Sequence, residues 1–393
     1  MSGTVIASWA RTPFGKFLGS LSSVSAVELG AAAIEGALGK AGVLPSHIDY
    51  VLMGMVVQAG TGQIPSRQAT IKAGLPMEIP SDTINKVCVS GLRAVNQADM
   101  MIRAGEARTV VAGGMENMSA APHLMEKGRI GIRMGPASLA DAMIKDGLWC
   151  PLYNVHMGVH GGKVPASYGV TREEADEWSL RSHQLAVKAI NHGYYNDEIT
   201  SVEVKHKKET KLIDTDELPR EDTTYEKLAQ LPPVFEEDGA VTAGNAPPIS
   251  DGAGALVIMG KEKARELGVP ILAEIISHGV ASDDPSRIST VPEAAGRQAL
   301  QKAGLKIDDI DLIEVNEAFA AVARTCIRLG NWDENKVNVN GGAVALGHPI
   351  GASGARILMT LVSELRRRGS SYGMATICSG MAQGEAIIVK AGE

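Results

Sequence analysis

The chain contains one α/β unit twice, and this internal repeat limits the possible fold more than any other feature of the sequence. Residues 37–49 (ALGKAGVLPSHID) align without a gap to residues 299–311 (ALQKAGLKIDDID), and seven of the thirteen positions are identical. Each segment predicts a helix that ends at a glycine, Gly42 or Gly304, and is followed by a strand. Two copies of one unit predict a duplicated α/β core.

A second pair of similar segments supports duplication. The alternative is that the two helix ends resemble each other by chance. The sequence SGLR at 90–93 corresponds to SGAR at 353–356, and both predict the first turn of a helix. The segments 109–115 and 375–381 then read as corresponding strands. Because the order of three elements is kept, we interpret the two segments as copies of one unit.

The two copies are separated by sequence of a different kind. Residues 119–245 are richer in charge and in His, Tyr and Trp, and they include a predicted helix at 171–192 that opens with a Thr171/Glu174 capping box. Residues 246–259 return to strand-like sequence with small side chains. The predicted division is therefore 1–118 plus 246–268 for the first half, 119–245 for an inserted domain that covers a site, and 269–393 for the second half.

Composition narrows the class of protein. The 393 residues are 45% hydrophobic but only 4% aromatic, with 44 glycines, so we expect a large core packed through small residues. A net charge of −7 argues against binding nucleic acid or anionic membranes.

Without a signal peptide or an apolar stretch of about 20 residues, we expect a cytoplasmic location. The four cysteines form no Cys-x-x-Cys pair, which argues against a zinc ribbon or redox dithiol.

Two segments are candidates for nucleophilic chemistry. Cys88 lies in NKVCVSG, just before the predicted helix at Ser90, where the helix dipole should favour the thiolate. His348 lies in the glycine-rich segment 340–354, at the corresponding place in the second repeat, so duplication predicts that a nucleophile faces its base. The alternatives are a cysteine that only fills the core and a histidine that only caps a turn.

Further candidates follow two strands of the second repeat. Cys378 lies at the end of one strand, where a buried filler thiol is the alternative, and Asn316 follows the strand DLIEV with an amide able to bind a water or an oxyanion. Glu317 reads either as a base or as a solvated carboxylate at a helix start, and we favour the latter. The pair His156 and His160 has the spacing of metal ligands but lacks the glutamate of a zinc protease, so no metal is expected.

Together these segments resemble the thiolase family, and closely its acetyl-CoA acetyltransferase branch. The resemblance covers essentially the whole chain, and it is carried by NxxCxSG at 85–91, NEAFA at 316–320, GGAxALGHPxGxSGxR at 341–356 and Cys-x-Gly at 378–380. It implies a duplicated five-layer αβαβα fold with an inserted loop domain, or lid, over the active site.

The resemblance also implies the catalytic roles. Cys88 corresponds to the nucleophile that accepts the acyl group, His348 to its activating base, and Cys378 to the thiol that exchanges a proton with the second substrate. Asn316, through a water, and His348 correspond to one oxyanion site. The backbone N–H groups of Cys88 and Gly380 correspond to the other.

Eight further residues match family positions that contact coenzyme A (CoA) or the acyl group. They are Leu148, His156, Met157, Arg220, Phe235, Ala243, Ala318 and Phe319. Met157 resembles the residue that blocks the acyl tunnel in the short-chain branch, and Arg220 would supply a local cation. Two departures from the family pattern, Pro247-Pro248 and the segment from Ile288 to Pro292, touch the substrate channel.

The expected reaction is the reversible Claisen condensation of two acetyl-CoA to acetoacetyl-CoA and CoA, without a cofactor other than the CoA substrate. The alternatives are a 3-ketoacyl-CoA thiolase of broader chain length in fatty-acid degradation, a decarboxylating ketoacyl synthase and a scaffolding homologue without activity. We expect a homo-oligomer, either a dimer or a tetramer in which residues 123–135 join two dimers.

Overall fold

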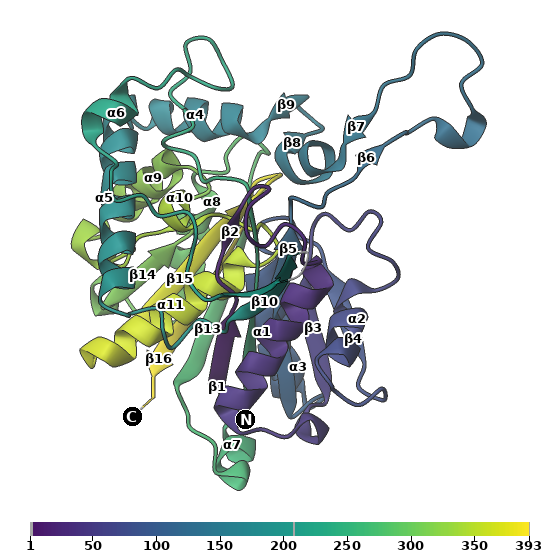
Figure 1. Cartoon of the computed structure of the whole chain (residues 1–393). Coiled ribbons are helices and arrows are strands. Elements are labelled where there is room, and N and C mark those ends of the chain that lie inside the picture. The colour runs from purple at the N-terminus through teal and green to yellow at the C-terminus, as the bar shows by residue number, and fades with distance from the viewer. Residues whose placement is uncertain (1–2, 207–208, 393) are drawn as a thin grey trace.

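Two sheets form the centre of the computed structural model, which describes residues 3–206 and 209–392 (Figure 1). The first sheet has the order β1-β12-β5-β3-β4, and the second has the order β13-β16-β15-β14. Short pairing of β1 with β13 over Thr4–Ile6 and Ala273–Ile275 joins them into one continuous sheet. The strands of the first sheet are β1 (Thr4–Arg11), β3 (Tyr50–Gly54), β4 (Ser81–Ile84), β5 (Thr109–Asn117) and β12 (Ser250–Gly260), with β2 (Gly15–Lys16) beside β12. Those of the second are β13 (Ala273–Ser282), β14 (Leu312–Val315), β15 (Tyr372–Ser379) and β16 (Gln383–Ala391).

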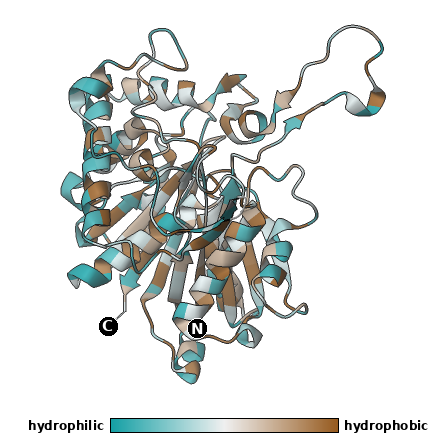
Figure 2. Ribbon diagram, viewed as in Figure 1, coloured by the Kyte–Doolittle hydropathy of each residue, from teal (hydrophilic) through white to brown (hydrophobic). Residues whose placement is uncertain are grey.

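Helices complete five layers, so the predicted αβαβα order is confirmed. α3 (Ser90–Ala104) and α11 (Ser353–Arg368) lie between the two sheets and contact each other. α1 (Ala26–Ala41) and α2 (Pro65–Lys72) cover the outer face of the first sheet, and α8 (Val291–Ala303) covers that of the second, beside α9 (Ala320–Gly330). Hydrophobic side chains concentrate on the buried strands, whereas the outer faces of the helices are polar (Figure 2).

Equivalent contacts in the two halves support the duplication. α1 and α8 end at Gly42 and Gly304, which both adopt left-handed φ angles, 63° and 68°. After them, the aligned residues Asp49 and Asp311 each accept a hydrogen bond of 2.9 Å from the backbone of the next central strand, at Thr109 and Tyr372 respectively. Identical side chains therefore make identical contacts in each copy.

Many of the inserted residues lie in the upper part of the molecule in Figure 1, and others extend down the left side and across the front of the core. The predicted helix is confirmed as α5 (Arg172–Asn191), with the capping box of Thr171 and Glu174. The other elements are β6 (His123–Leu124), β7 (Ala140–Asp141), a π-helical turn (Met143–Leu148), β8 (Trp149–Cys150), β9 (Val155–His156), α4 (Met157–Ser167), β10 (Val202–His206), β11 (Glu209–Ile213) and α6 (Tyr225–Ala229). The chain then returns to the first sheet as β12, between β1 and β5. The exact division at 118, 246 and 268 stays a prediction.

The remaining helices are α7 (Lys261–Leu267), which connects the two halves, and α10 (Ala343–Leu346), which contacts α5. No helix within the described residues has the length and hydrophobicity that a membrane-spanning helix needs.

Glycines let α3 and α11 approach each other closely at their amino-terminal ends. A β-carbon at Gly91 would lie 2.9 Å from the carbonyl oxygen of Gly351, and one at Gly354 would overlap the backbone nitrogen of Leu92. Contacts between backbone atoms cannot be relieved by turning a side chain. At this place the two halves therefore contact each other directly through backbone atoms, without side chains between them.

We expect Gly354→Ala to lower the free energy of unfolding by roughly 1–3 kcal/mol, because the added methyl overpacks this contact. Gly39→Ala is the matched control: it lies in α1, and a β-carbon there meets no atom within 4 Å. The control should instead stabilise the protein by about 0.5–1 kcal/mol. Thermal and denaturant unfolding would measure both, and equal effects of the two substitutions would contradict the packing argument.

Candidate active site

A cavity of about 520 Å³ lies where the two halves and the inserted segment meet. It is lined by four of the five predicted catalytic residues, Cys88, His348, Cys378 and Gly380. All eight predicted CoA-contacting residues also line it: Leu148, His156, Met157, Arg220, Phe235, Ala243, Ala318 and Phe319. The fold thus brings together residues that are up to 292 positions apart in sequence (88 to 380).

A strained turn presents Cys88 to this cavity. Val87 has a φ of 48°, in the left-handed region that a β-branched residue rarely adopts. The Asn85 side chain accepts a hydrogen bond from the Val87 N–H (3.1 Å), and the Ser90 hydroxyl donates to the Val87 carbonyl (2.6 Å). These contacts hold the turn, after which α3 begins at Ser90 as predicted.

The expected thiolate at Cys88 is wrong for the resting protein. Burial raises the pKa of Cys88 to about 11, although hydrogen bonds from the backbone N–H groups of Gly380 and of Cys88 itself act in the opposite direction. The negative charge of Glu116 raises it further. Desolvation outweighs the helix terminus, so Cys88 is a thiol that needs a base.

His348 has the properties of such a base. It lies between α10 and α11 and is 7% exposed. Burial, and then the charge of Arg356, lower its pKa to about 3, so the ring is neutral at physiological pH. Ser353 Oγ lies 2.6 Å from Nδ1 and donates its own hydrogen to the Pro349 carbonyl (3.0 Å). Nδ1 therefore carries the hydrogen, and Nε2 keeps the lone pair that can accept a proton.

Cys378 and Gly380 lie close to Cys88, on the part of the cavity wall that the second half contributes. Cys378 is near the end of β15 and is 2% exposed. Burial, followed by the neighbouring Cys88 and Cys326, raises the pKa of Cys378 well above the usual thiol range. Once ionised, such a thiol is a strong base. Gly380 follows in the β15–β16 turn and directs its N–H to the Cys88 sulfur.

Asn316 does not reach the cavity surface. It follows β14, is fully buried, and lies beside His348, with its Nδ2 atom 3.4 Å from His348 Nε2. Its Oδ1 atom has no hydrogen-bond partner among the described residues. The side chain can therefore still bind a polar group at the back of the site.

Glu317 is not a solvated carboxylate, so that expectation is wrong. It is fully buried and accepts hydrogen bonds of 2.9 Å from each of its four partners. They are Trp178 and Ser182 of α5, Asn338, and the backbone of Val344. Glu317 ties the inserted helix to the segment that leads to His348, which excludes it as a base facing the cavity.

Glu116 was missed by the sequence analysis, although an acidic residue within the apolar strand TVVAGGM-EN is an available signal. Its carboxylate accepts hydrogen bonds from the backbone of Val56 (3.0 Å), Val57 (3.1 Å) and Gly351 (3.0 Å). Burial raises its pKa to about 7. Because Gly351 belongs to the second half, Glu116 connects the loop after β3 with the turn that carries His348.

The two departures from the family pattern also line the cavity, since Pro247, Pro248 and Ile288 are among its wall residues. Arg220 is exposed at the cavity, where its charge is available to an anionic ligand. Met157 begins α4 and is 7% exposed. The apolar wall and one cation match a ligand with a narrow thioester arm and a charged end.

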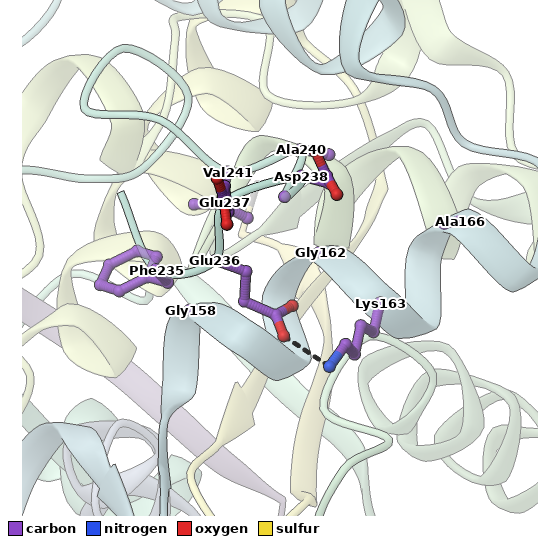
Figure 3. A pocket seen from close by; sticks show the side chains of 11 residues that line it. Gly158, Gly162, Lys163, Ala166, Phe235, Glu236, Glu237, Asp238, Ala240 and Val241 are labelled. Atoms are coloured by element: carbon purple, nitrogen blue, oxygen red, sulfur yellow. Dashed lines mark ion pairs between the residues drawn. The ribbon is translucent and has the colours of Figure 1, made fainter. Parts of the chain in front are cut away.

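Phe235 is shared between this cavity and a second one of about 400 Å³ (Figure 3). Its ring stacks on His156, with centroids 4.2 Å apart, and rests against Gly158. In the second cavity Lys163 pairs with Glu236 at 2.5 Å. Phe235 is therefore held in place from both sides.

The two histidines with metal-like spacing have separate contacts. His156 accepts a hydrogen bond from Gly158 N–H as the amino-terminal cap of α4, and His160 packs edge-on against Tyr153. Within residues 3–206 and 209–392, no group of three or more His, Cys, Asp or Glu side chains is placed to hold a metal ion.

Comparisons with known proteins agree with this geometry. The family model "Thiolase, N-terminal domain" matches residues 4–262, and "Thiolase, C-terminal domain" matches residues 269–391. An acetyl-CoA acetyltransferase of Pseudomonas aeruginosa is 49% identical over 98% of this chain and 99% of its own length. Another of Cupriavidus necator is 48% identical over 99% and 100%, respectively. The crystal structure of the Bacillus anthracis acetyl-CoA acetyltransferase superposes with a TM-score of 0.97, at 40% identity, covering 100% of this chain and 99% of that one.

The pKa of Cys88 predicts how its alkylation by iodoacetamide depends on pH. Because thiolate is the reactive form and the pKa is about 11, the rate should rise about tenfold per pH unit between pH 7 and 9. Mass spectrometry of the Cys88 peptide would measure the rate, with the cysteine of an unstructured model peptide as the control, whose rate levels off near its own pKa of about 8.5. A plateau for Cys88 below pH 8 would contradict a resting thiol.

Proposed function

The chain belongs to the thiolase family of acyltransferases, and we propose that it acts as an acetyl-CoA C-acetyltransferase. It joins two acetyl-CoA into acetoacetyl-CoA and CoA by a Claisen condensation, and it runs the reverse thiolysis. The observation that carries this proposal is the single cavity lined by two thiols, Cys88 and Cys378, and by a neutral imidazole, His348. The activity of the named relatives supports it.

In the first half-reaction His348 Nε2 takes the proton of Cys88, and the thiolate attacks the thioester carbonyl of acetyl-CoA. The N–H groups of Cys88 and Gly380 stabilise the oxyanion, which their present direction toward the Cys88 sulfur supports. The carbon–sulfur bond to CoA then breaks. The leaving CoA thiolate takes the proton of Cys378, which leaves an acetyl-Cys88, an imidazolium and a Cys378 thiolate.

In the second half-reaction the Cys378 thiolate removes a methyl proton from another acetyl-CoA. The imidazolium of His348 and Asn316, through a water, stabilise the enolate oxygen. The enolate carbon attacks the acetyl group, and Cys88 leaves as a thiolate that recovers its proton from His348. All three groups return to their resting protonation states, so CoA enters only as substrate and no further cofactor takes part.

Substituting Cys378 separates the two half-reactions. We expect Cys378→Ala to form acetyl-Cys88 from acetyl-CoA, because CoA can leave as a thiolate that takes its proton from solvent. The variant should lose condensation by at least about 100-fold, because the base for the methyl proton is gone. Peptide mass spectrometry and a spectrophotometric assay of acetoacetyl-CoA would measure the two steps. Cys150→Ala, at a buried cysteine outside the catalytic set, is the control. Equal loss of both half-reactions in Cys378→Ala would contradict the assigned role.

The lining residues named above form the proposed CoA site. Arg220 contacts the phosphates, while the edge-on pair Phe235 and Phe319, with centroids 6.4 Å apart, contacts the pantetheine arm and the acyl side. Met157 and Ile288 narrow the acyl end of the cavity, since both are nearly buried there. A short acyl group therefore fits better than a long one, which disfavours the broad-chain alternative.

Chain-length preference tests this part of the proposal. Thiolysis of acetoacetyl-CoA should exceed that of 3-ketodecanoyl-CoA by at least about tenfold in kcat/KM, because Met157 blocks the path of a longer chain. Met157→Ala should narrow that ratio, and Met143→Ala, another methionine that lines the cavity, is the control. A wild-type preference for the longer substrate would overturn the short-chain assignment.

The decarboxylating synthase is the second candidate, and the Cys378 thiol argues against it. A condensation driven by loss of CO₂ needs no base to remove a carbon-bound proton, so it has no use for a second thiol on the cavity wall. The presence of Cys378 near Cys88 in the same cavity favours proton abstraction.

We further propose that the protein is a homo-oligomer in the cytoplasm. The loop between β6 and β7 extends away from the rest of the chain (Figure 1), and it exposes Ile130 (80%) and Met134 (95%). Apolar side chains on an extended arm support its role in joining two dimers into a tetramer. A reducing compartment is supported by the need to keep Cys88 and Cys378 as thiols. A monomer in sedimentation velocity would contradict the assembly.

A further inference from the structure

An ion pair across the two halves lies beneath the catalytic cavity. Lys86, two residues before Cys88, places Nζ 2.7 Å from Oε1 of Glu385 on β16. Glu385 is fully buried, and its Oε2 accepts a hydrogen bond of 2.6 Å from Asn96, which is also fully buried in α3. Arg93 of α3 approaches the same carboxylate at 3.7 Å. The second half therefore contributes the carboxylate of Glu385. The three side chains that contact it, Lys86, Arg93 and Asn96, come from the Cys88 turn and from α3.

Glu385 cannot act on the substrate directly. In the β15–β16 pairing it lies opposite Ile377, one position before Cys378. Because neighbouring side chains of a strand point to opposite faces, Ile377 and Glu385 face the layer of α3 and α11, whereas Cys378 faces the catalytic side with Met157 and Ile288. Any effect of Glu385 on catalysis must pass through the backbone.

Lys86 also contacts the second half through its main chain. The hydroxyl of Ser379, the residue after Cys378, donates a hydrogen bond of 2.9 Å to the Lys86 carbonyl. The Lys86 N–H in turn donates to Ser90 at the start of α3 (2.8 Å). The side chain and main chain of one residue thus connect the Cys88 turn to both strands of the hairpin that carries Cys378.

Stability alone does not explain this arrangement. A buried ion pair is often no more stabilising than apolar residues of the same size, because removing two charges from water offsets their attraction. Glu385 is followed in β16 by the buried apolar residues Ala386, Ile387, Ile388 and Val389. An apolar residue here would extend that apolar run, so the charge calls for a role other than stability.

We infer that Lys86 and Glu385 are positioning residues that set the separation of the Cys88 turn from the Cys378 hairpin. The inference rests on the proposed function, because both half-reactions need groups from each side: Cys88 with the Gly380 N–H, and acetyl-Cys88 with the Cys378 thiolate. Displacing reacting groups by about 1 Å can cost about 100-fold in rate. The residues that line the CoA pocket do not include Lys86 or Glu385.

The test uses Glu385→Gln and the double variant Lys86→Met/Glu385→Gln in the full-length protein. The double variant removes both charges, so no buried charge is left unpaired and folding should be retained. We expect kcat for acetoacetyl-CoA thiolysis to fall about 10- to 100-fold in both variants, with KM for CoA and acetoacetyl-CoA within about threefold of wild type. The single variant Lys86→Arg should retain most of the wild-type kcat, because it keeps the positive charge opposite Glu385.

Asp99→Asn is the matched control. Asp99 is a buried carboxylate on the same helix, α3, where it pairs with Arg103 at 2.7 Å and approaches His278 of β13 at 3.5 Å. It makes the same kind of contact between the halves but lies far from the Cys88 turn. Its kcat should stay within about twofold of wild type, and unfolding temperatures of all variants would be measured in parallel.

Each outcome has a distinct meaning. A double variant with kcat within twofold of wild type overturns the positioning role, as does a rise in KM that accounts for the whole loss. The positioning role is also overturned if Glu385→Gln and Asp99→Asn lose kcat equally and each loss follows the decrease in that variant's unfolding temperature. An inactive wild type that forms no acetyl-Cys88 would instead refute the proposed function, and with it the premise of this inference.

Discussion

The site depends on direct contact between the backbones of α3 and α11. Gly91 and Gly354 face each other's helix where any side chain would collide with main-chain atoms. Each helix follows a turn that carries one partner of the proposed first chemical step, Cys88 before α3 and His348 before α11. A larger spacing between the helices would separate nucleophile and base, so the absence of side chains at these positions sets the geometry of the reaction.

The three side chains assigned to the chemistry, Cys88, His348 and Cys378, are uncharged at rest, and burial is the main cause. Burial keeps both thiols protonated and the imidazole uncharged, although a helix terminus favours the thiolate. Apart from Arg220 in the cavity wall, the charges closest to these groups lie outside the lining, on Glu116 and on the Lys86–Glu385 pair, where backbone N–H groups or an opposite charge compensate them. Separating structural charge from reacting groups keeps proton transfers between Cys88, His348 and the substrate free of permanent ion pairs.

Prediction from sequence succeeded where the information is local or repeated. The aligned helix ends at Gly42 and Gly304 predicted the duplication, and the motifs around Cys88 and His348 predicted residues that now share a cavity. It failed where the outcome depends on partners distant in sequence. Glu317 read as solvated because its partners on α5 lie more than 130 residues away, and the pKa of Cys88 was misjudged because burial by the second half is invisible in the NKVCVSG segment. Glu385 could not be assigned a role until its partner Lys86, 299 residues earlier, was located.

The position of β12 has a consequence for biosynthesis. This strand lies inside the first sheet, between β1 and β5, yet it comes after the whole inserted segment. While a ribosome makes residues 118–249, β5 lacks one of its neighbours and β1 lacks both, because β12 and β13 come later in the chain. Both strands are rich in apolar side chains, so their unpaired edges can pair with another chain. The interval in which this protein is most open to aggregation therefore falls during translation, before β12 is made.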